Sequence, residues 1–187
     1  MLIKCYNEDD GTAFGTWEDT MSKMLYFDST LEILRKIDIP NQVADYGGGN
    51  GLLKKFIPHA KTIDCDVSKK PDIIDNILTH DGEYNLVVLR YVLHYLDDYQ
   101  VLKLFKNIKA KNILVIQFTN QDLKSKYHNS VNEYKYFRNV TQLKALLPKQ
   151  AKEIYCKKYK LDETFYFNRL GHGNYVQHQE HLRAFYI

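Results

Sequence analysis

Two predominantly apolar segments constrain the fold of this chain more than any other feature of its sequence. They are YNLVVL at residues 84–89 and NILVIQF at residues 112–118. Apolar runs without polar alternation are typical of strands in a parallel sheet whose two faces are both covered. Because parallel neighbours need crossover connections, which are usually helices, the two segments predict an α/β fold.

The rest of the chain supplies the helices and strands that such a sheet needs. Apolar residues at helical spacing predict helical structure at residues 16–37, 52–57, 92–96, 99–108 and 141–147, the last capped by Thr141. Extended segments predict strands at residues 42–46, 62–67, 72–75, 84–89, 112–118, 153–167 and 181–187. We therefore expect one domain over residues 1–187, a three-layer Rossmann-like sandwich. Its sheet should be seven-stranded and mostly parallel, with an antiparallel terminal hairpin; residues 1–40 should form a helical N-terminal cap on a core of residues 41–187.

Composition narrows the class of protein further. The 187 residues fit about one domain, and no run of about 18 apolar residues predicts a membrane span. The amino terminus turns acidic within ten residues and lacks the apolar run of a secretory signal, so we expect a cytoplasmic protein. Three scattered cysteines, without a Cys-x-x-Cys pair, predict free thiols and no metal site.

The charges are unevenly distributed along the chain. Residues 1–100 carry 10 basic and 17 acidic side chains, whereas residues 101–187 carry 16 and 6. A basic half can be a nucleic-acid surface, with Lys157, Lys158 and Lys160 as its densest cluster, or simply a solvated face. If residues 154–160 form a strand, these lysines alternate between its two faces, which weakens the nucleic-acid interpretation.

A glycine cluster follows the first predicted strand of the core and carries the chemistry. It reads Asp45-x-Gly47-x-Gly49-x-Gly51, at the position where a doubly wound sheet binds its ligand. Glycines there let the backbone turn sharply and approach a ligand closely. A dinucleotide fingerprint would need its third glycine at position 52, which is Leu52, so the spacing argues against NAD.

The same cluster resembles the first motif of the class I S-adenosylmethionine-dependent methyltransferases, an acidic residue followed by Gly-x-Gly-x-Gly. The resemblance implies S-adenosyl-L-methionine as cofactor, S-adenosyl-L-homocysteine as product, and cofactor contacts from Asp45, Gly47, Gly49 and Gly51. An acidic residue at the end of the second strand should accept the ribose hydroxyls; we expect Asp66, with Val67 beside it, and Asp64 is its rival.

Residues 71–96 are similar to the small-molecule branch of that family. By this resemblance Asp75 meets the adenine amino group, with Asn76 beside it, and residues 92–96 match a Val-Leu-His-aromatic-Leu signature. The chain departs from the pattern in a compressed segment between Asp66 and Tyr84. The resemblance implies methyl transfer to oxygen or nitrogen of a small molecule. An RNA methyltransferase and an inactive cofactor-binding subunit are the alternatives.

Methyl transfer depends mainly on positioning, and needs a base only when the acceptor must lose a proton. Arg90 and Tyr91 follow the fourth core strand, where both could border the methyl group and Arg90 could also contact the cofactor. Gln117 and Thr119 lie at the end of the fifth strand and could border the methyl group as well. The first candidate base is His94, and the alternatives to it are His172, in the loop before the last strand, His178 and His181. The aromatic residues Trp17, Tyr26 and Phe27 could form a lid.

Overall fold

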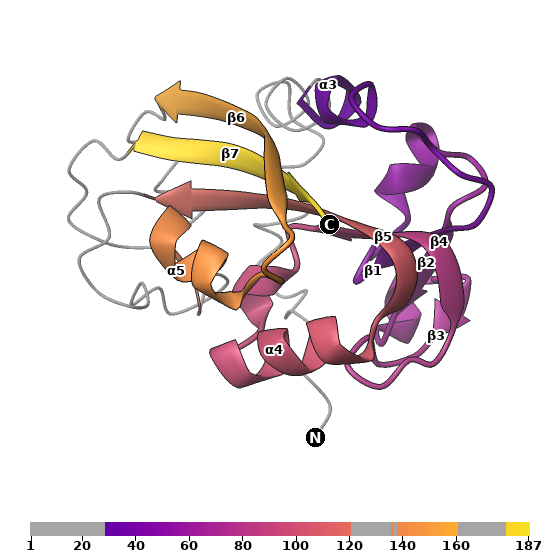
Figure 1. Cartoon of the computed structure of the whole chain (residues 1–187). Helices are drawn as coiled ribbons and strands as arrows, with labels where there is room; N and C mark the ends of the chain where they lie inside the picture. The colour runs from indigo at the N-terminus through magenta and orange to yellow at the C-terminus, as the bar shows by residue number, and fades with distance from the viewer. Residues whose placement is uncertain (1–28, 121–135, 137, 161–178) are drawn as a thin grey trace.

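A seven-stranded sheet forms the centre of the molecule (Figure 1). The computed structural model describes residues 29–120, 136, 138–160 and 179–187, and the following statements concern these residues. The strand order is β3-β2-β1-β4-β5-β7-β6. The strands are β1 (Val43–Tyr46), β2 (Lys61–Asp64), β3 (Ile73–Ile74), β4 (Glu83–Arg90), β5 (Lys109–Asn120), β6 (Lys152–Lys160) and β7 (Gln179–Tyr186).

The pairing confirms the predicted architecture. Strands β1 to β5 pair in parallel, whereas β7 runs antiparallel to both β5 and β6. The apolar runs at residues 84–89 and 112–118 lie inside β4 and β5, which sit side by side near the middle of the sheet. Strand order reverses between β1 and β4, so this pair marks the topological switch point, where open α/β sheets bind their ligands.

Both faces of the sheet are covered, as the apolar runs required. On one face α3 (Ser29–Leu34) and the 3-10 turn η4 (Leu52–Lys55) contribute Ile33 and Leu53 to a core shared with Leu86 and Leu114. On the other face lie the 3-10 turn η6 (Leu93–Tyr95), α4 (Asp98–Asn107) and α5 (Val140–Leu146). Figure 1 shows α3 and α4 on opposite sides of the strands.

Helices α4 and α5 have the predicted lengths, whereas the other helical segments differ from the prediction. Within the predicted helix at residues 52–57, Leu52–Lys55 form the 3-10 turn η4, and the amide of Phe56 bonds the carbonyl of Leu53 three residues back. Helix α3 ends at Leu34, before the predicted residue 37, and η6 replaces the helix expected at residues 92–96. Helix α5 begins after Asn139, not Thr141, because the Asn139 side chain accepts from the Gln142 amide in a reciprocal capping box.

The compressed segment between β2 and β4 contains only the 3-10 turn η5 (Val67–Lys69) and the two-residue strand β3. After β3, residues 75–82 cross to β4 without a helix. Ile77 and Leu78 are buried against Tyr46 and Val87 and so cover the sheet where a crossover helix would otherwise lie. Because the crossover is short, its residue His80 lies against Tyr46, the last residue of β1.

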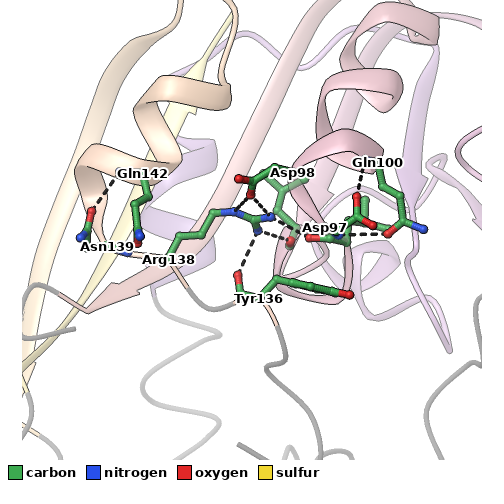
Figure 2. A network of polar contacts seen from close by, with 9 residues as sticks. Asp97, Asp98, Gln100, Tyr136, Arg138, Asn139 and Gln142 are labelled. Atoms are coloured by element: carbon green, nitrogen blue, oxygen red, sulfur yellow. Dashed lines mark hydrogen bonds and ion pairs between the residues drawn. The ribbon is translucent and has the colours of Figure 1, made fainter. Parts of the chain in front are cut away.

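A buried arginine holds η6 in place (Figure 2). The guanidinium of Arg138 donates to the carbonyls of Leu93, the first residue of η6, and Leu96, which follows η6, and pairs with the Asp98 carboxylate at 2.9 Å. The amide of Tyr136 donates to the carbonyl of His94 at 3.1 Å. Tyr136 and Arg138, which follow β5 in the sequence, therefore stabilise η6, the turn that follows β4. Within the described part of the chain, no helix is long and apolar enough to cross a membrane.

Candidate functional site

A pocket opens at the carboxyl ends of β1 and β4, at the switch point. It encloses about 500 Å³ of empty space, part of it open to solvent. The residues that line it come from the end of β1 and the turn after it, and from the end of β4 and the segment after it: Asp45, Gly47, Gly48, Gly49, Asn50, Leu52, Arg90, Tyr91, His94 and Tyr95. Six of the predicted site residues thus line one pocket: Asp45, Gly47, Gly49, Arg90, Tyr91 and His94. The predicted residues Gly51, Asp66, Val67, Asp75 and Asn76 are not among its lining.

Two glycines show why the turn after β1 needs this residue type. Gly47 has φ +66°, and a Cβ there would lie 2.9 Å from a methyl of Val92, so a side chain would clash with the segment after β4. At Gly48 a Cβ would lie 2.4 Å from Oδ2 of Asp45. The turn therefore passes directly over the Asp45 carboxylate, where a side chain at position 48 would have no room.

Asp45 is a buried carboxylate at the floor of this pocket. It is 1% exposed, and its Oδ2 has no hydrogen-bond partner among the described residues. Burial raises the pKa of Asp45 to about 6, and the nearby guanidinium of Arg90 opposes that rise. Nε of Arg90 is also buried and without a partner among those residues. A buried carboxylate and a guanidinium, each with an unused polar atom, are suited to a ligand carrying both an ammonium and a carboxylate.

The second strand ends at Asp64, not at Asp66, which corrects the strand end on which the choice of Asp66 rested. Oδ1 of Asp64 accepts from the Asp66 amide at 2.9 Å, and this turn bends the chain away from the sheet. Oδ2 of Asp64 accepts from the Gly49 amide at 2.9 Å, so the carboxylate faces the glycine turn. The Asp66 side chain instead accepts from the amide and hydroxyl of Ser68 and caps η5. The geometry favours Asp64 over Asp66 as the residue that faces a ligand.

Asp75 lies next to Asp64 at the same edge of the sheet, since its amide donates to the Asp64 carbonyl at 3.1 Å. Its carboxylate is about two-fifths exposed and accepts from His80 and from the Asn76 amide. The Asn76 side chain accepts from the Leu78 amide and stabilises the turn that follows. Val67 is 63% exposed on η5. Asp75 and Val67 are thus open at this edge, whereas the Asn76 oxygen serves the backbone.

The segment after β4 begins with a backbone conformation that is unusual for its residue type. Tyr91 has φ +57°, in the left-handed region that costs most residues free energy. Its ring stacks on Phe118 with centroids 5.3 Å apart, and the Arg90 guanidinium lies 5.8 Å from the ring centroid. The packing thus holds both residues of the predicted pair at the pocket.

His94 lines the pocket but is 2% exposed. Its Nδ1 lies 2.9 Å from Nε2 of Gln117, a residue of β5. Burial lowers the pKa of His94 to about 3, although the hydrogen bond to Gln117 opposes that fall. The imidazole is therefore neutral at physiological pH. Thr119, the other residue expected near the methyl, instead bonds the Arg183 guanidinium at 3.1 Å and does not line the pocket.

Several predicted residues lie outside the described part of the chain. These are His172 and His178 in the loop before the last strand, and the aromatic residues Trp17, Tyr26 and Phe27. His181 is on β7, paired with Thr119 of β5 in the register of the sheet. Among the described residues, no group of three or more His, Cys, Asp or Glu side chains could hold a metal ion. Asn50 and Tyr95 line the pocket and were not predicted individually, although both lie within the motifs.

The strand order, the glycine turn and the acidic residues at the strand ends define the fold of the class I S-adenosylmethionine-dependent methyltransferases. Solved structures agree. The PH0226 protein of Pyrococcus horikoshii OT3 matches with a TM-score of 0.61 at 8% identity, covering 97% of this chain and 99% of its own. The N-methyltransferase NodS of Bradyrhizobium japonicum WM9, solved with S-adenosylhomocysteine, matches with a TM-score of 0.56 at 12% identity, covering 92% and 90%.

A third similar structure is the complex of DhpI with SAM and HEP, which matches with a TM-score of 0.61 at 12% identity over 95% of this chain and 93% of DhpI. No protein-family model matches the sequence. No curated protein matches it either. At such low identities the likeness establishes the fold, and the function has to be argued from the site.

Proposed function

We propose that this protein is an S-adenosylmethionine-dependent methyltransferase that methylates oxygen or nitrogen of a small molecule. The observation that carries the proposal is the placement of three carboxylates at the ends of three adjacent strands, around one glycine turn. Asp45 belongs to the end of β1, Asp64 ends β2, and Asp75 follows β3.

The three carboxylates match the three donor groups of the cofactor in their order. S-adenosylmethionine carries an ammonium at one end, two ribose hydroxyls in the middle and an exocyclic amine on adenine at the other end. Asp45 would accept from the ammonium, Asp64 from the ribose hydroxyls and Asp75 from the adenine amine, since carboxylates only accept hydrogen bonds when ionised. The unused Oδ2 of Asp45 supports the first assignment.

Arg90 would serve the same end of the cofactor as Asp45. Its guanidinium attracts the Asp45 carboxylate electrostatically and borders the pocket. A guanidinium suits a carboxylate partner, and the methionine end of the cofactor offers one. We propose Gly47, Gly49 and Gly51 as the turn that lets the ligand approach the backbone, with Val67 as an apolar contact near the adenine.

The cofactor supplies a methyl group activated by a sulfonium, and the protein's own residues have to position the acceptor and exclude water. Tyr91, packed on Phe118, forms an apolar wall beside Arg90. His94 is neutral and would orient the acceptor by hydrogen bonding, because a group with a pKa of about 3 is a weak base. An acceptor that must lose a proton therefore needs another base, for which His172 is our candidate.

Calorimetric titration with S-adenosylhomocysteine tests the cofactor assignment, with NAD as the negative control. We expect saturable binding of the first ligand and none of the second, and we expect Asp45→Asn to weaken binding. Transfer of a labelled methyl group from S-adenosylmethionine to pools of small hydroxylated and aminated compounds, with RNA as a parallel pool, tests the reaction. Cofactor binding without transfer to any pool would instead indicate a binding subunit without catalysis.

A further inference from the structure

Asp75, His80 and Tyr84 are joined in a short chain of hydrogen bonds. Nδ1 of His80 lies 2.7 Å from Oδ2 of Asp75, and Nε2 of the same ring lies 3.0 Å from the hydroxyl of Tyr84. Because an ionised carboxylate can only accept, Nδ1 carries hydrogen and donates to Asp75. In the neutral ring, Nε2 then accepts from the Tyr84 hydroxyl. Each ring nitrogen of His80 thus has a defined partner.

The surroundings of His80 fix the orientation of its ring. The side chain is 9% exposed, stacks against Tyr84 and meets the edge of Tyr46, with centroids 6.0 and 5.6 Å away. Gly82 allows this arrangement, because a Cβ there would lie 2.5 Å from Nε2 of His80 and 2.7 Å from the Tyr84 hydroxyl. A buried ring held on several sides aims Nδ1 in one direction.

The Asp75 carboxylate is consequently held in one orientation while remaining partly open. Oδ1 accepts from the Asn76 amide at 2.7 Å and Oδ2 accepts from His80, which leaves further acceptor capacity on each oxygen. The hydrogen bond from His80 holds the pKa of Asp75 below its usual value, with help from the Asn76 amide. The carboxylate is therefore ionised and acceptor-only at neutral pH. The adjacent Asp64 places it beside the ligand that the glycine turn binds.

We infer that His80 is a positioning residue that holds Asp75 as a fixed acceptor and thereby makes the site specific for a 6-aminopurine. This inference rests on the proposed cofactor function. The fixed carboxylate accepts a hydrogen bond from the exocyclic amine of adenine. With a 6-oxopurine the carboxylate would meet another acceptor, so the hydrogen bond to the base is lost and the two oxygens repel.

Two histidine variants separate this role from simple structural support. An Asn side chain places its amide near the position of Nδ1, so His80→Asn keeps the donor to Asp75 and loses the bond to Tyr84. A Gln side chain reaches the position of Nε2, so His80→Gln keeps the contact with Tyr84 and loses the donor to Asp75. Asp81→Asn, at an exposed residue of the same segment, is the matched control.

Calorimetry with S-adenosylhomocysteine and with S-inosylhomocysteine, its 6-oxo counterpart, measures the discrimination. We expect the wild type and Asp81→Asn to prefer the 6-amino ligand by about 10- to 150-fold, the worth of one hydrogen bond to a charged group. His80→Asn should retain that preference within about threefold, whereas His80→Gln should lose most of it. Thermal unfolding of each variant checks that it is folded at the temperature of titration.

The outcomes separate the two proposals. If the wild type does not bind S-adenosylhomocysteine, the proposed function fails and this inference fails with it. If the wild type binds both ligands equally, the cofactor assignment stands and the role of His80 is refuted. Retained discrimination in folded His80→Gln, or equal loss in both histidine variants, also refutes it.

Discussion

Replacement of Asp64 by Asn should weaken the binding of S-adenosylhomocysteine far more than replacement of Asp66 by Asn. Each Asp64 oxygen already accepts one backbone amide, that of Asp66 or that of Gly49, and has capacity for one ribose hydroxyl. Asn keeps only one accepting oxygen and carries no charge. At least one charge-assisted bond to the ligand is lost, worth about 1.5–3 kcal/mol, which corresponds to about 10- to 150-fold in affinity.

Asp66→Asn is the matched control, because it makes the same chemical change two residues away. The Asp66 carboxylate serves Ser68, through its amide at 2.9 Å and its hydroxyl at 2.6 Å. We expect this variant to change affinity by less than about threefold, since Asn can still accept from Ser68 as a cap and the change does not touch a ligand contact.

Isothermal titration of the wild type and both variants is the assay, accompanied by thermal unfolding. The second measurement matters because Asp64 also holds the glycine turn through Gly49. The reasoning is refuted if Asp66→Asn weakens binding more than Asp64→Asn does, because the ligand would then lie beyond η5 rather than against the end of β2.

Four further predictions follow from the site. Burial raises the pKa of Asp45 to about 6, so affinity for S-adenosylhomocysteine should rise as pH increases from about 5 to 7, and titrations of Asp45→Asn should show a weaker, pH-independent affinity. The pKa of His94 is about 3 in the folded protein, below its ordinary value of about 6.5, so on acidification the unfolded chain is protonated at this residue before the folded protein is. The contribution of His94 to stability is therefore full above about pH 6.5 and falls at lower pH. Denaturant unfolding should therefore show a stability difference between wild type and His94→Gln that shrinks between pH 7 and about 4.5. Arg138→Met should lower the free energy of unfolding by about 3 kcal/mol, because it removes one partner of a largely buried ion pair and the side-chain donor to the carbonyls of Leu93, Leu96 and Tyr136. Gly48→Ala should reduce both stability and cofactor affinity, since its Cβ would lie 2.4 Å from Oδ2 of Asp45, and thermal unfolding with and without ligand measures the two effects.

Local patterns in the sequence were sufficient to predict the sheet. The apolar runs within β4 and β5 identify strands buried on both faces, and the glycine cluster marks the turn after β1. The position of that cluster, after the first strand of a doubly wound sheet, indicates where a ligand binds. The number and direction of the strands and the place of the pocket were therefore predictable, whereas the order of the strands came from the structure.

The end of β2 was not predictable, because one side-chain hydrogen bond decides it. Asp64 and Asp66 are chemically identical and two residues apart, so the pattern of apolar residues allows either as the last residue of the strand. The bond from the Asp66 amide to Asp64 bends the chain at the earlier position. The short turn η4 depends in the same way on local backbone bonds rather than on apolar spacing.

Two histidines illustrate the limit imposed by tertiary structure. The sequence singled out His94 as a base, but the surrounding layers bury it and keep it neutral. It did not single out His80, whose partners Asp75 and Tyr84 lie five residues before it and four after it in a segment without regular structure. In the sequence alone, the spacing of Asp75, His80 and Tyr84 does not indicate a hydrogen-bonded chain; only the folded structure brings the three side chains together.

A crystal structure of the protein with S-adenosylhomocysteine tests the central claim most directly. The account predicts the ligand at the carboxyl ends of β1 to β4, with its ammonium on Asp45, its ribose hydroxyls on Asp64 and its adenine amine on Asp75. Ligand bound elsewhere, or bound at the glycine turn with its adenine directed away from Asp64 and Asp75, would contradict it.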